Sequence, residues 1–264
     1  MNIAHKAPTP AEVYDDRFVP ALFAHWGPVM CEIAGLRTGD RVLDVACGTG
    51  ALARAALERV GPSGKVAGID PNQDMLAVAR RRNPGIEWQV GRAEAIPFPD
   101  ASFDAVVSQF GFMFFEDRAG ALREMMRVLR PGRRLAVAVC DAVERSPGYA
   151  AFATLLQRLF GQPVADAFRA PFILGDPEKL RAICDEAGLA HAEISRRSDL
   201  VRFSSIDALV SAERACVWTL GGVLSDDQFT RLLKESEQAL KPFVGADDSI
   251  TFDMPALIIV AGKR

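Results

Sequence analysis

One unit near the start of the chain constrains its fold more than any other part of the sequence. The run Arg41–Ala46 is an apolar strand that contains one acid, Asp44, and it leads into a loop with two glycines. The segment after the loop has the composition of a helix, and a second apolar run, Lys65–Ile69, ends in Asp70. This order predicts a βαβ unit that binds a nucleoside, because glycines let the backbone approach a ligand and the acid can hold ribose hydroxyls.

The pattern of the following residues extends this unit into a layered α/β sheet. Short β-branched runs alternate with amphipathic segments from 41 to 140, which predicts parallel strands joined by right-handed helical crossovers. The expected strands are Arg41–Ala46, Lys65–Ile69, Ile86–Val90, Phe103–Gln109 and Arg133–Cys140. The expected helices are Gly50–Val60, Gln73–Arg82 and Asp117–Leu129, with Pro131-Gly132 as a helix stop before the next strand.

The alternation of short β-branched runs and amphipathic segments ends after Cys140. We expect the helix Tyr149–Phe160, followed by a loop rich in Gly, Pro and Phe. A second helix is expected from Asp176-Pro177 to about Gly188. After it we expect a strand at about 190–202, two helices in 204–242 and a last strand at 249–262. Pro255 in the last strand indicates a bulge or a sheet edge. At the other end of the chain, residues 10–35 predict one or two helices with Pro20 as a break.

These elements predict a doubly wound, mostly parallel seven-stranded sheet of the Rossmann-like type, with an antiparallel last strand and a helical cap. We expect a single domain over 1–264 with a cofactor-binding core at about 36–142. The helices at 1–35, 146–174 and 204–242 are expected to form the cap, because ligands of open parallel sheets bind beyond the carboxyl ends of the strands.

Composition and charge limit the cellular compartment and the kinds of partner that we expect for this protein. The formal net charge of −3 gives no electrostatic footprint for nucleic acid, and the short arginine clusters are scattered. Five cysteines without a Cys-x-x-Cys pair and without a signal-peptide pattern predict reduced thiols in the cytoplasm. No apolar run reaches membrane-spanning length, and the three histidines lack the spacing of a metal site.

Two kinds of nucleoside cofactor fit the glycine loop. The segment Gly48–Ala53 matches the dinucleotide fingerprint with alanine in the third place, and Asp70 has the right spacing, so an NAD(P)-dependent oxidoreductase is one alternative. Against it, the carboxylate of Asp44 would repel a pyrophosphate, whereas it suits a ligand with an ammonium group. The chain also lacks a Tyr-x-x-x-Lys proton relay, since its only tyrosines are Tyr14 and Tyr149.

Several further motifs follow the glycine loop in a fixed order. They are Asp44–Gly50, Gly68–Leu76, Gly91–Asp104, Gln109–Phe112 and Arg127–Gly132. In this order and at this spacing the sequence resembles class I S-adenosylmethionine-dependent methyltransferases over about residues 40–140. It is most similar to the small-molecule enzymes of the ubiquinone/menaquinone-biosynthesis kind.

This resemblance implies a set of cofactor contacts. The loop at Ala46–Gly50 would lie under the methionine half of S-adenosyl-L-methionine, Asp70 would bind the ribose diol, and Gln109 would lie under the sulfonium. Pro71, Met75, Arg92 and Ala93 would surround the adenine, although the family usually has an acid or an amide where Arg92 stands. The implied cofactor-binding residues are Asp44, Ala46, Gly48, Thr49, Gly50, Asp70, Pro71, Met75, Arg92, Ala93 and Gln109.

Each of these residues also has a purely structural interpretation. Asp70 could cap the following helix, and Asp44 could cap the glycine loop. Gln109 could satisfy backbone groups at a strand end, and Met75 could fill the core. The same holds for the phenylalanines after the fourth strand, for which a place in the core is the default.

The acceptor and the chemistry are less defined by sequence. Methyl transfer is an in-line displacement, so a base is needed only for an acceptor that is protonated in the ground state. His25, Tyr14 and Asp141 are candidates for that base by position alone, and each could instead be a packed or surface residue. The absence of an obvious base leaves open a silent nucleoside-binding scaffold protein.

A small-molecule acceptor is the expected partner. The nucleic-acid amine methyltransferase signature is absent after the fourth strand, where Ser108-Gln109-Phe110-Gly111 stands instead. The Phe-rich segment 168–175 resembles the acceptor-side loop of related enzymes and predicts a partly apolar acceptor, with Arg169 pairing an anionic group. Phe172, Tyr14 and Phe18 are the other expected acceptor contacts.

Overall fold

A computed structural model describes residues 8–264 of the chain; the part of the expected cap that falls on residues 1–7 lies outside the described residues. Its centre is a seven-stranded sheet. The strands are β1 (Arg41–Val45), β2 (Lys65–Asp70), β3 (Glu87–Val90), β4 (Phe103–Gln109), β5 (Leu129–Cys140), β6 (Glu193–Phe203) and β7 (Ile250–Gly262). They lie in the order β3-β2-β1-β4-β5-β7-β6, with β7 antiparallel to both neighbours and the other pairs parallel. The predicted fold class is confirmed.

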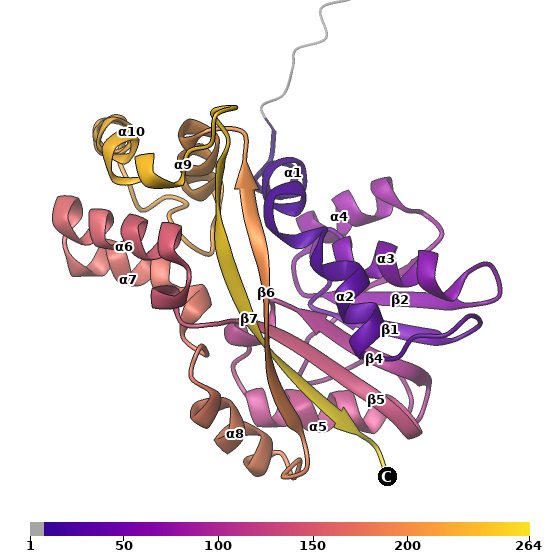
Figure 1. Cartoon of the computed structure of the whole chain (residues 1–264). Coiled ribbons are helices and arrows are strands. Elements are labelled where there is room, and N and C mark those ends of the chain that lie inside the picture. Colours follow the sequence, from indigo (N-terminus) through magenta and orange to yellow (C-terminus); the bar gives the residue numbers. More distant parts are fainter. Residues whose placement is uncertain (1–7) are drawn as a thin grey trace, which may run out of the picture.

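Helices cover both faces of this sheet. One layer consists of α2 (Trp26–Ile33), α3 (Ala51–Val60) and α4 (Gln73–Arg82), and the other of α5 (Arg118–Val128) and α8 (Pro177–Glu186) (Figure 1). Because both faces are covered, β4 is almost wholly buried, and so is β5 over residues 135–140, its apolar half. Pro131 and Gly132 lie inside β5 rather than in a turn before it, since α5 passes directly into the strand at Leu129.

A second group of helices stands apart from these layers. We call it the helical lobe; it consists of α6 (Pro147–Phe160), α7 (Gln162–Arg169), α9 (Ile206–Ala215) and α10 (Asp226–Ala239), at the left of Figure 1. The expectation of a loop after residue 160 was wrong. Pro163 lies in the first turn of α7, where a missing N–H costs nothing, and the buried Ala165 and Phe168 face α6.

Strands β6 and β7 continue beyond the end of β5. The pairing of β5 with β7 ends at Cys140 and Ala256, whereas β6 and β7 remain paired as far as Phe203 and Ile250. The continuation, residues 198–203 and 250–255, is called the ribbon here. It rises from the sheet toward the helical lobe and α1 (Pro10–Val13) in Figure 1.

Pro255 forms no bulge, but the edge interpretation holds on one side, because the residue lies where β7 extends past the end of β5. β7 is an interior strand, and Pro255 pairs in unbroken register with Ser198 of β6. Its carbonyl accepts from the Asp141 N–H, so its nitrogen also points toward β5, where that strand has just ended. A proline is tolerated here because no β5 carbonyl requires its missing N–H.

Pro20 does not break the N-terminal helix. After α1 the chain continues as the π-helical segment η1 (Tyr14–Phe23), which contains Pro20, and then as α2. The wider winding is visible where the Ala24 N–H donates to the Val19 carbonyl five residues back. Local π-type winding is a usual way to keep a helix continuous around an irregularity. Short 3-10 turns lie at Phe112–Phe114, Val143–Arg145, Ala170–Phe172 and Lys241–Phe243.

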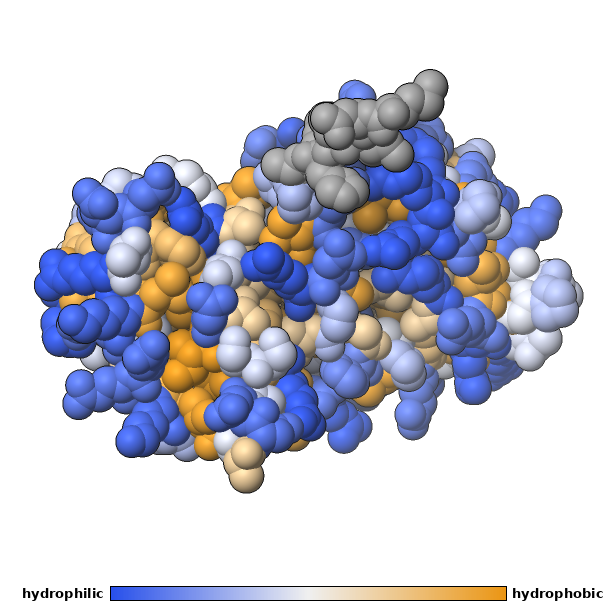
Figure 2. Space-filling view, turned by 90° about the horizontal axis from the view of Figure 1, so that it is seen from above, coloured by the Kyte–Doolittle hydropathy of each residue, from blue (hydrophilic) through white to orange (hydrophobic). Residues whose placement is uncertain are grey.

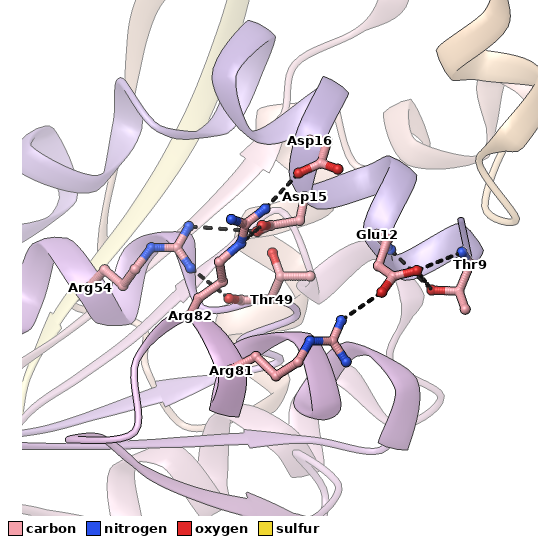
Figure 3. A network of polar contacts seen from close by, with 8 residues as sticks. All are labelled: Thr9, Glu12, Asp15, Asp16, Thr49, Arg54, Arg81 and Arg82. Carbon is pink, nitrogen blue, oxygen red and sulfur yellow. Dashed lines mark hydrogen bonds and ion pairs between the residues drawn. The ribbon is translucent and has the colours of Figure 1, made fainter. Parts of the chain in front are cut away.

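Arginines fasten this N-terminal segment to the sheet side of the molecule (Figure 3). Arg82 of α4 bonds the buried Asp15 at 2.5 Å and Asp16 at 2.6 Å, and Arg54 of α3 lies 3.7 Å from Asp15. Arg81 reaches Glu12 at 2.8 Å. The segment is therefore held against α3 and α4. Within residues 8–264, no helix has the length and hydropathy needed to cross a bilayer.

Candidate active site

A cavity of about 470 Å³ lies where the carboxyl ends of β1, β2, β4 and β5 meet η1, the ribbon and the helical lobe. This volume falls in the range of small-molecule sites. Its lining is mostly aromatic and apolar, with few polar side chains. Figure 2 shows hydrophobic surface along the junction between the helical lobe, at left, and the rest of the molecule.

The glycine loop after β1 forms the floor of one end of the cavity. Gly48 and Gly50 have φ of +54° and +86°, a conformation that favours glycine. A Cβ on Gly50 would overlap the Trp88 ring of β3, and a Cβ on Gly68 would lie 2.5 Å from the same ring. Trp88 is fixed by its indole N–H, which donates to the Asn83 carbonyl at 2.8 Å. The loop is therefore compact, with its backbone directed at the cavity.

Two non-glycine residues at neighbouring strand ends also have positive φ. Ala46 follows β1 with φ +58°, and Phe110 follows β4 with φ +55°. Such conformations cost of order 1–3 kcal/mol each and cluster at functional sites. The two turns touch, since a Cβ on Gly111 would lie 2.6 Å from that of Ala46. Both turns line the cavity, so this strain marks the same place as the glycine loop.

Asp70 ends β2 at the rim of the cavity. One carboxylate oxygen accepts from the Gly48 N–H at 2.9 Å, and the other from the Asn72 N–H at 2.8 Å. The structure rules out the interpretation of Asp70 as a helix cap, because Asn72 caps α4 with its own side chain. Burial raises the pKa of Asp70, against the two N–H groups that lower it. Each carboxylate oxygen keeps a lone pair free for a diol.

Four buried polar atoms at this end of the sheet have no hydrogen-bond partner within the described chain. They are Asp44 Oδ2, Thr49 Oγ1, Ser108 Oγ and Gln109 Oε1. Burial raises the pKa of Asp44 well above its usual value, and the Ala53 N–H only partly offsets this. Only Gln109 of the four lines the cavity, and because buried polar atoms without partners are rare, its free Oε1 indicates a polar ligand there.

The N-terminal segment closes the cavity above the glycine loop. Tyr14 and Phe18 of η1 both line it, and Tyr14 stacks on Phe18 and Phe23 with ring centroids 6.0 and 5.4 Å apart. Burial, followed by the nearby Cys216 thiol and Asp70, raises the pKa of Tyr14. Its hydroxyl therefore stays protonated at neutral pH and can donate a hydrogen bond, but it is a poor base.

The cavity brings together part of the predicted cofactor set. Ala46, Gly48, Asp70, Pro71, Met75 and Gln109 line it. Asp44, Thr49 and Gly50 lie directly behind this wall and are buried. Arg92 does not line the cavity; it is exposed and pairs with Glu116 at 2.9 Å, while Ala93 is buried nearby in the chain but also off the lining.

Among the predicted catalytic and acceptor residues, three lie off the cavity lining. His25 is exposed where η1 passes into α2. Asp141 is buried and paired with Arg196 and Arg145, and one of its oxygens also accepts from the Ala142 N–H. Arg169 lies 3.9 Å from Asp166 at the end of α7. Phe172, Tyr14 and Phe18 do line the cavity.

Sequence reasoning missed an acid at the far end of the cavity. Glu213 of α9 lines it and is fully buried, and it accepts from the Thr219 hydroxyl at 2.8 Å. A signal was present, since Glu213 falls on the helix face of Leu209 and Val210, and an acid on an apolar face is unusual. Tyr149 and Cys216 line the cavity near Glu213, whereas Trp218 lines it beside Tyr14.

Comparison with known proteins identifies this arrangement. The sequence profile of a family described as "Methyltransferase domain" matches residues 42–132. The "Ubiquinone/menaquinone biosynthesis C-methyltransferase UbiE" of Hahella chejuensis is 38% identical over 180 residues, which is 62% of this chain and 72% of that relative.

Two solved structures share the fold. The YcgJ protein of Bacillus subtilis has a TM-score of 0.59 at 22% identity, over 91% of this chain and 98% of that one. Phosphoethanolamine N-methyltransferase 2 of Haemonchus contortus, solved with S-adenosylhomocysteine, has a TM-score of 0.59 at 19% identity, over 96% of this chain and 57% of that one. With its glycine loop, its Asp70 and these matches, the chain belongs to the class I S-adenosylmethionine-dependent methyltransferases.

Proposed function

We propose that this enzyme transfers the methyl group of S-adenosyl-L-methionine to a small, partly apolar acceptor held in the aromatic part of the cavity. The observation that carries the proposal is the continuity of one cavity from Asp70 and the glycine loop to the aromatic side chains of the helical lobe. A donor at one end and an acceptor at the other would then meet without solvent between them. In this proposal η1, the ribbon and the helical lobe form the cap.

The residues at the sheet end fit the cofactor. The free lone pairs of Asp70 suit the two ribose hydroxyls, and the apolar Pro71 and Met75 lie beside it to receive the adenine. The buried, unpartnered Oε1 of Gln109 would accept from the ammonium group, and the positive charge of the donor would favour the ionised form of the buried Asp44 behind the cavity wall. When bound, S-adenosyl-L-methionine supplies an activated methyl carbon on a positively charged sulfur.

The protein contributes alignment and exclusion of water. Tyr14 and Phe18 cover the glycine loop from above, while Phe110, Phe172 and Met254 close the sides of the cavity. Fixing two reactants in line replaces much of the entropy cost of a bimolecular step. A dry surrounding also strengthens the field of Asp44 and Asp70 on a cationic donor.

The acceptor is proposed to be uncharged or cationic rather than anionic. No Arg, Lys or His of the described chain lines the cavity, whereas two acids do, Asp70 and Glu213. An anionic acceptor would therefore lose its hydration without gaining a partner. The proposed pairing of Arg169 with an anionic group has no support in this geometry, because Arg169 faces Asp166 and Gln157 outside the lining.

Calorimetric titration tests the proposal directly. The purified protein should bind S-adenosylhomocysteine saturably and NADH not at all, and Asp70→Asn should weaken the binding of S-adenosylhomocysteine. Release of S-adenosylhomocysteine in the presence of small acceptors then separates an enzyme from a silent binding protein. Binding of NADH in preference to S-adenosylhomocysteine would contradict the proposal and favour an oxidoreductase.

A further inference from the structure

The far end of the cavity holds a polar cluster that cofactor binding does not use. Glu213 lies there among Tyr149 of α6, Cys140 of β5, and Cys216 and Thr219 of the segment after α9. These groups come from distant parts of the chain and meet in an otherwise aromatic wall formed by Phe168, Phe172 and Met254. A buried carboxyl costs several kcal/mol of desolvation, so its presence in such a wall needs an explanation.

A structural role accounts for only part of this cluster. The Thr219 hydroxyl donates to Glu213 Oε2 at 2.8 Å, which ties α9 to the following segment. The hydroxyl of Tyr149 is also fully buried and close enough to Glu213 for the two groups to interact, yet it has no geometrically sound hydrogen bond within the described chain. One acid with spare lone pairs and one unpartnered hydroxyl therefore face the same cavity.

We propose that Glu213 is the general base of the enzyme and that Tyr149 donates a hydrogen bond to the acceptor oxygen, so that the acceptor is an aromatic or enolic compound with an acidic hydroxyl. This inference rests on the proposed function, because it assigns the acceptor end of the same cavity. A hydroxyl satisfies both groups at once, since it donates to Glu213 and accepts from Tyr149.

The step balances within the enzyme, the acceptor and the methyl donor. The acceptor O–H bond breaks and its proton passes to Glu213. The electron-rich oxygen, or the ring or enol carbon conjugated with it, forms a bond to the methyl carbon. The carbon–sulfur bond breaks, and its electron pair stays on sulfur, which becomes neutral. Tyr149 donates to the acceptor oxygen while that oxygen carries negative charge.

The electrostatics of the cluster fit this assignment. Burial raises the pKa of Glu213 to about 7, with the hydroxyls of Thr219 and, to a smaller extent, Tyr149 opposing the shift. The titratable groups that face it are Tyr149, Cys140 and Cys216, and burial raises the pKa of each, that of Cys216 to about 11. They therefore remain neutral, and Glu213 is the group that changes charge near neutral pH.

The pKa of Glu213 also restricts the chemical class of the acceptor. A base whose pKa lies near 7 can deprotonate a phenol, with a pKa of about 10, far more readily than an aliphatic hydroxyl, which is about as weak an acid as water. The aromatic rings of Tyr149, Phe168 and Phe172 present faces and edges to a flat acceptor. A carboxylate in place of the hydroxyl would be repelled by Glu213.

A shape-matched series of probes tests the inference. With S-adenosylhomocysteine bound, the wild type should bind 2-naphthol and should bind 2-naphthoate at least tenfold more weakly. With S-adenosyl-L-methionine, it should methylate 2-naphthol with a kcat/KM that rises with pH through a pKa near 7. Glu213→Gln should lower kcat about 100-fold or more, abolish that rise, and leave the affinity for S-adenosylhomocysteine unchanged.

Two variants separate catalysis from folding. Thr219→Val removes the hydrogen bond that lowers the pKa of Glu213, so it should move the rise in kcat/KM to higher pH, which a merely structural bond would not do. Glu237→Gln, an exposed acid of α10, is the matched control and should match the wild type.

The inference is overturned if S-adenosylhomocysteine binds but 2-naphthol is neither bound nor methylated, or if Glu213→Gln keeps wild-type turnover and pH dependence. It is also overturned if 2-naphthoate binds as well as 2-naphthol. Failure of S-adenosylhomocysteine to bind would instead contradict the proposed function itself, so the two failures are distinct.

Discussion

The two ends of the cavity are built in different ways. At the sheet end, which we call the cofactor end, the lining comes from turns after β1, β2 and β4, and much of it is backbone and glycine. At the other end, the acceptor end, side chains from α6, α9, β7 and the segments between them converge. The first end is built by the order of strands in the sheet, and the second by the packing of helices that the sheet does not fix.

This difference explains where each end can vary. Backbone N–H groups and glycines cannot be exchanged without moving the turn, so the cofactor end tolerates little change. Aromatic side chains can be exchanged one at a time, so the acceptor end can be altered without loss of the donor site. Four experiments test this division, from the largest expected effect to the smallest.

The sharpest test is a pair of substitutions with opposite effects. Asp70→Ala removes two charge-assisted hydrogen bonds to the ribose and should weaken S-adenosylhomocysteine binding about 100-fold. Phe172→Ala removes part of the aromatic wall and should raise the KM for 2-naphthol about tenfold without changing S-adenosylhomocysteine binding. Calorimetry and steady-state kinetics measure the two effects. Equal losses of S-adenosylhomocysteine affinity in both variants would contradict the division of the cavity into two independent ends.

The acceptor end should be less stable than its packing suggests. The pKa of Glu213 is about 7 in the folded protein against an ordinary 4.5, so the folded state binds the extra proton. Stability due to this group therefore falls as pH rises from about 4.5 to about 7 and is level above it. Glu213→Gln should be about 3 kcal/mol more stable than the wild type at pH 8, with little difference at pH 4.5. Urea unfolding at the two pH values measures this difference.

Glycine replacements test the rigidity of the cofactor end. Gly50→Ala combines a φ of +86° with overlap of the new Cβ on Trp88, and it should cost about 2 kcal/mol of stability. Gly188→Ala at the end of α8 is the matched control, because φ is +79° there and no atom lies within 4 Å of the new Cβ. It should cost about 1 kcal/mol. Equal losses on chemical denaturation would show that overlap with Trp88 is unimportant.

The smallest expected effect concerns the arginines of Figure 3. Arg82 is half exposed, so Arg82→Ala should cost at most about 1 kcal/mol of stability. It should also reduce the salt dependence of S-adenosylhomocysteine binding, since this ion pair holds η1 over the cofactor end. Arg202 of the ribbon forms an exposed ion pair with Asp247. Arg202→Ala removes this ion pair and should leave the salt dependence of S-adenosylhomocysteine binding unchanged. Identical salt profiles for the two variants would contradict this role for Arg82.

The difference between the two ends of the cavity also decides which features could be predicted from the sequence. The mostly parallel seven-stranded sheet, the glycine loop and the place of Asp70 were predictable, because a βαβ unit carries its ligand groups within a few residues of each strand end. Glu213 was not, because its meeting with Tyr149 depends on how α9 and α6 both pack against α10, which no local pattern encodes. The break expected at Pro20 was wrong for a related reason: proline was judged by its usual position, while the hydrogen bonding of the surrounding helix decides where it is tolerated.

The ribbon has a consequence for how acceptor choice can change. Residues 198–203 and 250–255 lie beyond the end of β5 and form their ladder with each other, yet Met254 lines the cavity and Phe203 packs edge-on against Phe18. A replacement on these residues alters the room available to the acceptor without disturbing a strand that carries the donor site. Lineages that share the methyl donor can therefore diverge in substrate through a few exchanges on two strand ends, with no insertion or deletion in the chain.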